Sequence, residues 1–421
     1  MLNNKNFLVF SLFLLSFGAI ADNNDLKITD RVIKSASLKY APDKRTALFE
    51  MVSEEISGQI ILKGKTNLAE AKRLVLDSLT LLGISYLDSV LVLPEQSIGD
   101  KIWAIATLSV VSMRSGPDHA AELVTQALMG TPVKVLEKAD NWYRIQTPDQ
   151  YIGWVEENGI ALKPENEMAV WKQSKRFIFN RITGYAVGTP KRRAMHVSDL
   201  VLGDLFEMVS ESKKYLQIKF PDDRTAFVKK NDCLSYQQFT DRKANVREVI
   251  AVAQQLMGTP YLWGGTSCKA MDCSGLTKTA YFSQGIILAR DASQQARYGE
   301  HPDFNEIQNL QPGDLLFFGR SAQRVNHTGI YMGDGRYIHA SGLVQINSID
   351  PKDPTFNLTE RRRLVAVSRI VNSLNTEGIV KVKDHEWYGS PQPPPNPLQK
   401  RRLKKEAPPK SSPQGRTLRE P

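Results

Sequence analysis

The sequence predicts an α+β protein of several domains, in which a small α/β module and two small β-barrels precede a larger mixed domain. Three observations lead to this prediction. Residues 102–236 contain two similar runs of short strand patterns separated by turns. The stretch from Gly258 to Leu276 brings turn formers and a cysteine to the start of a helix pattern. A later hairpin pattern carries two histidines.

Composition describes an ordinary globular chain. With 421 residues, the length suggests roughly two to four domains, and 41% hydrophobic with 24% charged residues is usual for soluble proteins. The net charge of +10 is mostly local, because eight basic and two acidic side chains from Lys400 to the end contribute +6 of it. The rest of the chain is only mildly basic, so no nucleic-acid partner is expected.

The N-terminus has the pattern of a cleaved secretory signal. Lys5 precedes an apolar run from Phe7 to Phe17, which is too short to span a bilayer and is followed by a small-x-small site. We expect cleavage after Ala21, so that residues 1–21 are the signal peptide; a retained anchor is the alternative. No later segment is apolar for long enough to span a bilayer. The sequence therefore predicts a periplasmic or secreted protein with no transmembrane segment after signal cleavage.

Residues 22–100 are predicted to form the small α/β module. Strand patterns cover residues 46–51, 58–62 and 89–92, and apolar residues recur at helical spacing over residues 67–82. This order gives a strand–strand–helix–strand unit. The segment contains no chemical motif, which favours a packing or docking role.

The two barrels are predicted at residues 101–163 and 164–236 from an internal repeat. A shift of 73 residues aligns the copies without a gap and matches Gly130 with Gly203, Ile145 with Ile218, Pro148-Asp149 with Pro221-Asp222, Val155 with Val228 and Asn158 with Asn231. Cys233 falls on Ile160, which predicts a packed structural thiol. Tyr151 falls on Arg224, so the barrel does not need an aromatic residue there, and we expect Tyr151 to face something outside its domain. The pattern resembles bacterial SH3-like domains.

Residues 237–247 are predicted to be a polar linker to the mixed domain, residues 244–372, which contains Cys273. This cysteine lies immediately before the helix pattern from Leu276 to Gln284. A cysteine on the first turn of a helix meets the positive end of the helix dipole, which favours its thiolate and lowers its pKa. The alternative is a small buried residue. An odd number of cysteines in an exported chain also implies a free thiol or an intermolecular bridge.

His327 and His339 lie on opposite arms of one predicted hairpin whose tip is Gly333-Asp334-Gly335. A two-residue loop would put the histidines on opposite faces, because side chains alternate along a strand. We predict a three-residue loop with Gly335 in the left-handed conformation, or an equivalent bulge. Either would make the two imidazoles diagonal neighbours on one face.

These residues suggest nucleophilic catalysis. Cys273 would attack, His327 would take the thiol proton and later protonate the leaving amine, and His339 would fix the tautomer of His327. The backbone N–H of Cys273 and the phenol of Tyr261 would hold the oxyanion. Two alternatives remain, a Cys2His2 zinc site that adds Cys268 and an inactivating Cys268–Cys273 disulfide. The C-x4-C and H-x11-H spacings differ from the common zinc patterns, so neither metal nor cofactor is expected.

Three blocks of this domain resemble the NlpC/P60 cysteine peptidases. They are YLWGG with DCSGL around Cys273, LQPGDLLFF at residues 310–318, and HTGIYMG with YIHAS at residues 327–341. The resemblance covers about residues 244–372 and implies a papain-like core that cleaves peptides of bacterial peptidoglycan. The order barrel–barrel–peptidase further resembles the γ-D-glutamyl-L-diamino acid endopeptidases of the dipeptidyl-peptidase VI type. These enzymes remove L-Ala-γ-D-Glu from peptides with a free N-terminal alanine.

The resemblance also implies substrate-binding positions. Tyr261, Trp263 and Ser274 match the substrate wall, whereas Glu122, Tyr151 and Asp291 match the groups that hold the substrate's ammonium. An acidic pair is physically suited to a cation. Without the resemblance, Glu122 would be interpreted as a surface charge and Asp291 as a helix N-cap.

The predicted function is therefore that of an exported cysteine peptidase acting on γ-D-glutamyl–diamino acid bonds of peptidoglycan stem peptides (muropeptides). The alternatives are an amidase or acyltransferase of the papain-like superfamily, and a peptidoglycan-binding protein without activity. Residues 375–421 lose periodicity, and nine of the 22 prolines lie between Pro391 and Pro421. We predict a disordered, basic tail there. Attraction of this tail to an anionic cell-wall polymer is the alternative to simple solvation.

Overall fold

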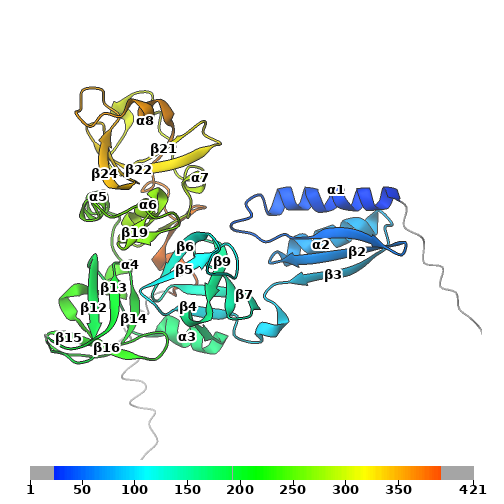
Figure 1. The fold of residues 1–421 in the computed structure, drawn as a ribbon, viewed down its shortest axis with the longest axis horizontal. Helices are drawn as coiled ribbons and strands as arrows, with labels where there is room; N and C mark the ends of the chain where they lie inside the picture. Colours follow the sequence, from blue (N-terminus) through cyan, green and yellow to red (C-terminus); the bar gives the residue numbers. More distant parts are fainter. Residues whose placement is uncertain (1–22, 192, 390–421) are drawn as a thin grey trace, which may run out of the picture. The chain divides into compact units, whose positions relative to one another are not determined.

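The computed structural model describes residues 23–191 and 193–389, so the predicted signal peptide and the predicted tail beyond residue 389 lie outside the described residues (Figure 1). The chain divides into two compact units. The first contains Met1–Glu165 with Leu262–Thr266, and the second contains Asn166–Tyr261 with Ser267–Pro421. The architecture is mixed α+β, as the sequence predicts. No helix of the described part is long and apolar enough to cross a membrane.

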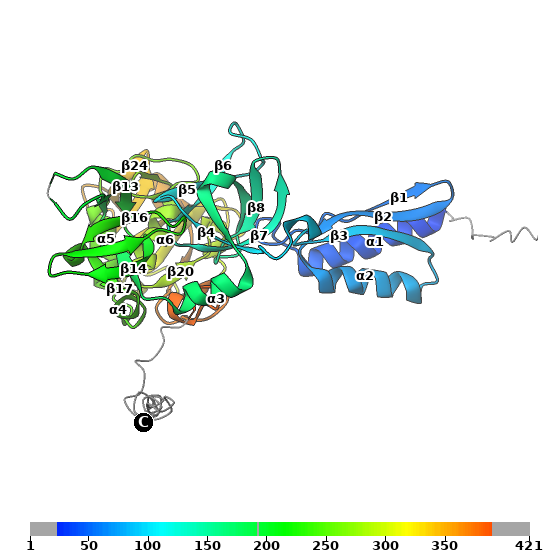
Figure 2. The same cartoon turned by 90° about the horizontal axis from the view of Figure 1, so that it is seen from below.

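The first unit begins with an α/β module in which two helices cover one face of a three-stranded sheet (Figure 2). Its elements are α1 (Asn23–Tyr40), β1 (Val52–Ile56), β2 (Gln59–Thr66), α2 (Ala69–Leu81) and β3 (Tyr86–Val92). Strand β2 pairs antiparallel with β1 and parallel with β3, and the parallel pair needs α2 as its crossover. Apolar residues of both helices and the sheet, including Ile60, Leu62 and Leu79, form the core.

Two details of the predicted module are wrong. Residues 46–51 form no strand apart from an isolated bridge at Phe49, and the first strand starts at Val52. Helix α1 is an additional element, which buries Ile33 and Ala36 against the module core. The predicted strand at 89–92 lies within β3, the predicted strand at 58–62 overlaps β2, and the predicted helix at 67–82 contains α2.

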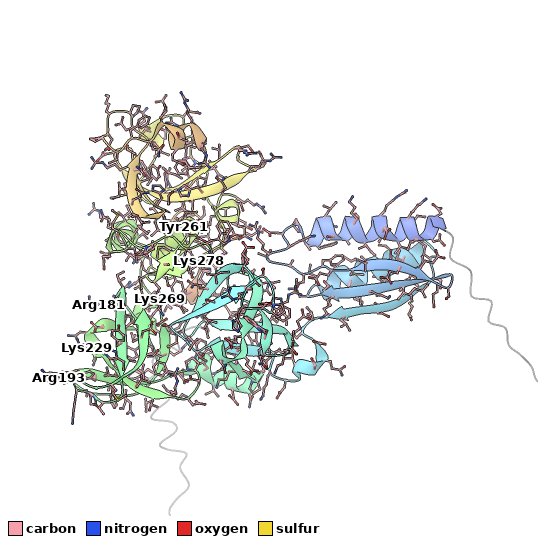
Figure 3. All side chains as sticks on the ribbon, in the orientation of Figure 1. Arg181, Arg193, Lys229, Tyr261, Lys269 and Lys278 are labelled. Atoms are coloured by element: carbon pink, nitrogen blue, oxygen red, sulfur yellow. The ribbon has the colours of Figure 1, made fainter. Side chains whose placement is uncertain are left out.

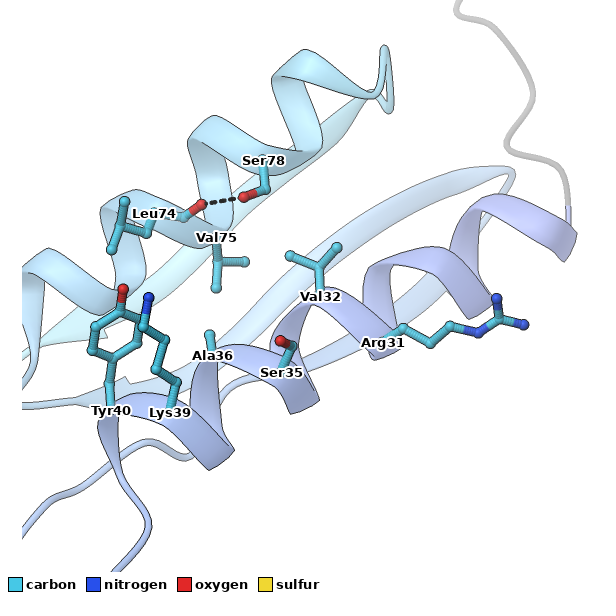
Figure 4. Close-up of a pocket in the computed structure, with 9 residues that line it drawn as sticks. All are labelled: Arg31, Val32, Ser35, Ala36, Lys39, Tyr40, Leu74, Val75 and Ser78. Atoms are coloured by element: carbon cyan, nitrogen blue, oxygen red, sulfur yellow. Dashed lines mark hydrogen bonds between the residues drawn. The ribbon is translucent and has the colours of Figure 1, made fainter.

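A groove of about 460 Å³ runs between α1 and α2 (Figure 4). Its floor contains Val32, Ala36 and Val75, and its rim contains Arg31 and Lys39. The hydroxyl group beside them, on Ser78, already donates a hydrogen bond to the Leu74 carbonyl at 2.7 Å. The groove lies on the surface where α1 and α2 pack against each other.

The first barrel completes this unit. Its strands are β4 (Trp103–Ala106), β5 (Val110–Arg114), β6 (Leu123–Leu128), β7 (Pro132–Ala139), β8 (Trp142–Gln146), β9 (Ile152–Glu156) and β10 (Ile160–Lys163), in the order β10-β4-β7-β8-β9-β5-β6. The module packs against it through a cluster of Leu48, Leu93, Leu136 and Ile152. The Ile152 N–H also donates to the Arg45 carbonyl at 2.7 Å. These contacts make the module part of the same unit as the barrel.

The second barrel repeats the topology of the first. Its strands are β11 (Arg176–Phe179), β12 (Thr183–Val187), β13 (His196–Val201), β14 (Leu205–Glu211), β15 (Tyr215–Lys219), β16 (Thr225–Lys229) and β17 (Cys233–Ser235). The order β17-β11-β14-β15-β16-β12-β13 matches the first barrel strand for strand, so the internal repeat is confirmed. Helix α3 (Glu165–Gln173) lies between the barrels in sequence.

The predicted linker at residues 237–247 is mostly helical. Helix α4 (Tyr236–Thr240) starts at a capping box formed by Ser235 and Gln238, and it buries Phe239. Helix α5 then begins at Val246. Residues 241–245, between the two helices, are not helical, and the polar side chain of Thr240 is buried.

The mixed domain has a five-stranded antiparallel sheet in the order β24-β23-β22-β21-β25. Its strands are β21 (Leu315–Gly319), β22 (Val325–Gly333), β23 (Arg336–Ser341), β24 (Leu343–Ser348) and β25 (Leu364–Ser368); its helices are α5 (Val246–Gln255), α6 (Cys273–Phe282), α7 (Ala292–Gln295) and α8 (Leu358–Arg363). Short strand pairs are β18 (Thr266–Ser267) with β19 (Ala270–Met271), and β20 (Ile286–Leu288) with β26 (Ile379–Lys381). Leu276 and Ala280 of α6 pack on Ile330 and Ile338 of the sheet.

The predicted disorder from residue 375 onward is wrong for its first part. Strand β26 pairs with β20, and the following residues Trp387 and Tyr388 are buried. The hydroxyl of Tyr236 donates to the Gly389 carbonyl at 3.0 Å, which holds the end of this segment on α4. Residues 375–389 are therefore ordered.

Candidate active site

Cys273 is the first residue of α6, and its neighbours fix where that helix begins. Asp272 is the N-cap residue, and its Oδ1 accepts a hydrogen bond from the Gly275 N–H at 2.7 Å. Arg290 donates to Asp272 Oδ2 at 2.6 Å, and the two side chains are only 1% and 7% exposed. The ion pair with Arg290 and the hydrogen bond from Gly275 hold the buried Asp272 carboxylate in one position. Cys273 is thereby held at one defined place.

The thiol of Cys273 is buried, with the residue 5% exposed, and it is hydrogen-bonded by the backbone N–H groups of Thr328 and Ser274. Burial and, secondly, the Asp272 carboxylate raise the pKa of the thiol to about 12, whereas the two N–H groups and Arg290 act in the opposite direction. The predicted lowering of this pKa by the helix N-terminus is therefore wrong for the resting protein. The thiol is neutral at pH 7 and needs a base when it reacts.

In the hairpin of His327 and His339, both imidazoles lie on one face of the sheet as predicted, but the loop is shorter than predicted. Gly333 pairs with Arg336, so the loop is the two residues Asp334 and Gly335, both at positive φ. The register shifts between Tyr331 and Gly333, and beyond that bulge Gly329 pairs with His339. A bulge of this kind adds one residue to one strand, so His327 and His339 lie on the same face despite the two-residue loop. The equivalent bulge that we predict is thus present, and it lies before the turn.

His327 and His339 are hydrogen-bonded to each other. The distance from His327 Nε2 to His339 Nδ1 is 2.7 Å, and the rings meet edge to face. His339 Nε2 in turn lies 2.7 Å from Oδ1 of Asn347 on β24. The close approach of β22 and β23 depends on Gly329, where a Cβ would lie 2.9 Å from the Ile338 oxygen. The three side chains form one polar row across adjacent strands.

Both imidazoles are neutral at pH 7. Burial, followed by His339 and Arg363, lowers the pKa of His327 to about 3. Burial also lowers the pKa of His339, although the hydrogen bond to Asn347 and the Glu360 carboxylate oppose this. A neutral imidazole has one nitrogen with a free lone pair, so each ring can accept a proton. The arrangement provides a base in the same domain as the neutral thiol.

Tyr261 and Ser274 flank the cysteine. Tyr261 is labelled in Figure 3. Burial, followed by Cys273 and Asp272, raises the pKa of Tyr261, so its phenol keeps its proton and can donate a hydrogen bond. The hydroxyl of Ser274 is buried and donates to Asp272 Oδ1 at 3.1 Å while it accepts from Arg290 at 3.0 Å. Ser274 is therefore engaged in the network that holds the start of α6.

In the first unit, Glu122 and Trp263 are in contact. Trp263 Nε1 donates to Glu122 Oε1 at 2.6 Å, while the Trp263 ring remains 61% exposed. The next residue, Gly264, has φ +80°, and a Cβ there would lie 2.3 Å from the Leu123 oxygen. Segment 262–266 is thus attached to the first barrel by contacts that only this glycine allows. Tyr151 in the same barrel is 6% exposed.

Asp291, in the second unit, is the N-cap residue of α7, and its N–H bonds the Gln294 side chain at 3.0 Å in a capping box. Its carboxylate also lies 3.9 Å from Arg290. The capping interpretation of Asp291 therefore describes its local structure. The Asp291 carboxylate is also partly exposed to solvent.

All three cysteines are free. The Cys268 thiol donates to the Ile182 carbonyl at 3.0 Å, so the alternative Cys268–Cys273 disulfide is not formed. Burial raises the pKa of the Cys233 thiol to about 12, which fits a packed thiol. Within residues 23–191 and 193–389, no group of three or more potential metal ligands converges.

Two features of the site were missed from the sequence. The Asp272–Arg290 pair could have been suspected, because Asp directly before a helix pattern is an N-cap signal, but its cationic partner is 18 residues away. Asn347 gives no local signal, because its position opposite Tyr337 depends on the register of β23 and β24. Spatial pairing across strands is needed to find it.

Comparisons with known proteins identify two families in the chain. Residues 258–363 match the NlpC/P60 family, and residues 113–160 match the bacterial dipeptidyl-peptidase Sh3 domain. A relative from Bacillus cereus, named gamma-D-glutamyl-L-lysine dipeptidyl-peptidase, is 31% identical over 238 residues, which are 53% of this chain and 68% of the relative. Dipeptidyl-peptidase 6 of Lysinibacillus sphaericus is 27% identical over 280 residues, which are 63% of this chain and 99% of that protein.

One solved structure also resembles the chain. The crystal structure of an NlpC/P60 family protein from Bacillus cereus covers 63% of this chain and 99% of its own, with a TM-score of 0.56 and 24% identity. At that identity the likeness concerns the fold.

Proposed function

From the premise that this chain belongs to the NlpC/P60 family of cysteine peptidases, we propose that it hydrolyses the γ-D-glutamyl–diamino acid bond of peptidoglycan stem peptides. The observation that carries the proposal is the buried Cys273 thiol, hydrogen-bonded to the strand of His327, together with the His327–His339–Asn347 row. The name of the Bacillus cereus relative, gamma-D-glutamyl-L-lysine dipeptidyl-peptidase, supports the choice of bond.

The chemistry follows from the protonation states. Because the thiol and the imidazoles are neutral at pH 7, His327 would accept the thiol proton as the sulfur forms a bond to the γ-carbonyl carbon. His327 would then give this proton to the leaving amine of the diamino acid as the amide C–N bond breaks. Water, deprotonated by the same imidazole, would hydrolyse the thioester and release the γ-carboxylate and the thiol. Proton transfer coupled to attack avoids a buried ion pair in the free enzyme.

The proposed oxyanion donors are the Cys273 backbone N–H and the Tyr261 phenol. The upward shift of the Tyr261 pKa, caused by burial and by Cys273 and Asp272, supports a phenol that remains a donor. Donors of this kind stabilise charge that develops on the carbonyl oxygen, and loss of one typically costs about 100-fold to 1,000-fold in kcat.

For specificity, we propose that Glu122, Tyr151 and Asp291 hold the free ammonium of an N-terminal L-alanine. Two carboxylates and a phenol are suitable partners for such a cation. Trp263 and Ser274 would line the substrate, and the hydrogen bond from Trp263 to Glu122 supports a preset orientation for that carboxylate. Export to the periplasm or beyond, with signal cleavage after Ala21, is part of the same proposal.

The decisive experiment compares the wild-type protein with Cys273→Ala. Purified muropeptides with a free L-alanine should be cut by the wild type between D-glutamate and the diamino acid, as read by mass spectrometry of the products. C273A should bind the same peptides without cutting them. Hydrolysis by C273A, or no hydrolysis by the wild type, would contradict the proposed peptidase, and the second result would favour a binding protein.

A matched pair of substrates tests the ammonium pocket. The free-amine peptide and its N-acetylated form differ only at the charge that Glu122 and Asp291 would recognise. We expect kcat/KM to fall by about 10-fold to 100-fold on acetylation, because the Glu122 and Asp291 carboxylates would lose their charged partner. Equal rates on both peptides would contradict this pocket while leaving the peptidase assignment intact.

A further inference from the structure

The amide of Asn347 is held in one orientation. Its Nδ2 donates to the backbone carbonyl of Thr355 at 3.2 Å, and its Oδ1 lies 2.7 Å from His339 Nε2. A carbonyl oxygen can only accept, so the reversed amide would place two oxygens against each other. The Asn347 oxygen therefore faces His339, and it requires a hydrogen on Nε2 of that ring.

This requirement fixes both imidazoles in turn. A neutral His339 that carries its hydrogen on Nε2 has its lone pair on Nδ1. That nitrogen lies 2.7 Å from His327 Nε2, so His327 must carry its hydrogen on Nε2 and donate it. The remaining nitrogen, Nδ1 of His327, is left with its lone pair.

We propose that Asn347 is a positioning residue that, through this row of hydrogen bonds, makes Nδ1 of His327 the basic atom of the site. The inference rests on the proposed function for the use of that base, but the tautomers themselves can be measured without any substrate. It goes beyond a nucleophile and two histidines, because the orientation of the whole row is set by a residue on β24 and by the Thr355 carbonyl behind it.

The groups around the row are compatible with neutral rings. Helix α8 carries Glu360, which favours a proton on His339, and Arg363, which disfavours one on His327. Tyr337 stands beside His339 on β23 with a ring distance of 4.9 Å, and its pKa is raised by burial, so its phenol is neutral. Arg363 also bonds Glu360 at 3.0 Å, which offsets part of that carboxylate's charge. Asn347 adds an oriented dipole and no further charge.

The test uses ¹⁵N-histidine-labelled full-length protein in the C273A background, where turnover cannot interfere. We expect the ring ¹⁵N shifts of His327 and His339 at pH 7.5 to report hydrogen on Nε2 in both. Asn347→Leu should shift His339 toward a mixture of tautomers, because its Nε2–H loses its acceptor. Hydrogen on Nδ1 of either ring in the parent protein, or unchanged shifts in N347L, would overturn the proposal.

Two further variants guard against a purely structural effect. Gln345→Leu changes an amide on the same strand that bonds the Ser341 carbonyl, and it should leave both tautomers and kcat unchanged. Asn347→Asp keeps the acceptor and adds a negative charge, so it should keep the Nε2 tautomers and move the acidic limb of the kcat/KM profile to higher pH. In the active background, N347L should lower kcat by about 10-fold to 100-fold, the usual effect of losing a supporting hydrogen bond to a functional histidine. An N347D profile that does not move, or a Q345L tautomer change equal to that of N347L, would contradict the proposed role.

Discussion

At the scale of single residues, Arg290 supports the position of Cys273 through the two residues next to it in sequence. It is 1% exposed, and it bonds both Asp272 and Ser274, the two residues on either side of Cys273. A buried pair gives little net stability compared with apolar residues of the same size, but removing one partner leaves an uncompensated charge. The placement of Cys273 therefore depends on both members of the Asp272–Arg290 pair.

We predict that Arg290→Met lowers the free energy of unfolding by about 3–5 kcal/mol, because it leaves the Asp272 carboxylate buried and unpaired. The double variant Asp272→Asn with Arg290→Met should recover part of this loss, since Asn also caps helices and carries no charge. Urea denaturation of the two variants measures both effects. A loss below about 1 kcal/mol in R290M would be inconsistent with the burial of this pair.

At this scale, sequence reasoning correctly placed Cys273 on the first turn of a helix and misjudged one protonation state. A helix N-terminus favours a thiolate, but Cys273 is also buried beside a carboxylate, and these two effects outweigh the dipole. Burial depends on segments far away in the sequence, including β22. The resting charge of the nucleophile could therefore not be read from its local motif.

At the scale of elements, the histidine hairpin depends on one close strand approach. Gly329 on β22 faces His339 on β23, and a Cβ at Gly329 would lie 2.9 Å from the Ile338 oxygen and 3.0 Å from the His339 Cβ. Contacts of that length with backbone atoms force the strands apart. The hydrogen bond between the histidines would then lengthen.

Gly329→Ala should therefore destabilise the protein by about 1–3 kcal/mol and reduce activity more strongly than stability loss alone explains. Gly188→Ala is a suitable control, because its Cβ would meet nothing closer than 3.7 Å and should change stability by less than about 0.5 kcal/mol. Thermal melting and the rate of muropeptide cleavage are the measurements. Full activity in G329A would mean that the strand spacing at the histidines tolerates a methyl group.

The hairpin also illustrates the limit of prediction for elements. Placing both imidazoles on one face correctly implied a β-bulge. Without a bulge, a two-residue loop puts the two histidines on opposite faces of the sheet. Its location before the turn, between Tyr331 and Gly333, could not be predicted from the Gly-Asp-Gly tip. Helix α1 was missed because its buried residues, such as Ile33 and Ala36, are interspersed with charged residues next to the predicted signal.

At the scale of the whole molecule, the second unit is completed by residues near the end of the described chain. Strand β26 pairs with β20, the Val382 N–H donates to the Gly285 carbonyl at 2.8 Å, and Trp387 is buried. The loss of periodicity from residue 375 and the Pro-rich composition beyond Pro391 predict disorder over residues 375–421. The segment from 375 to 389 is short and has no repeated pattern, so only its tertiary partners reveal it as ordered.

A chain ended after Leu374 should lose several buried apolar side chains at once, including Ile379, Val382 and Trp387. At about 1.5–3 kcal/mol for each large apolar side chain, the loss approaches the whole stability of a typical domain, so we expect a large drop in melting temperature or failure to fold. A chain ended after Gly389 retains every contact described here and serves as the control. Equal melting of the two truncated chains would show that residues 375–389 do not stabilise the fold.

The protonated state of Cys273 has a practical consequence for inhibition. Because burial raises the pKa of the thiol to about 12, the sulfur is protonated at pH 7.5 and the anion is scarce. Simple alkylating reagents and peroxide should therefore modify the resting protein slowly, even though we propose this sulfur as the nucleophile. A useful covalent inhibitor would first have to bind next to Cys273 as a substrate does. Its electrophile could then react with the sulfur as the thiol proton is transferred.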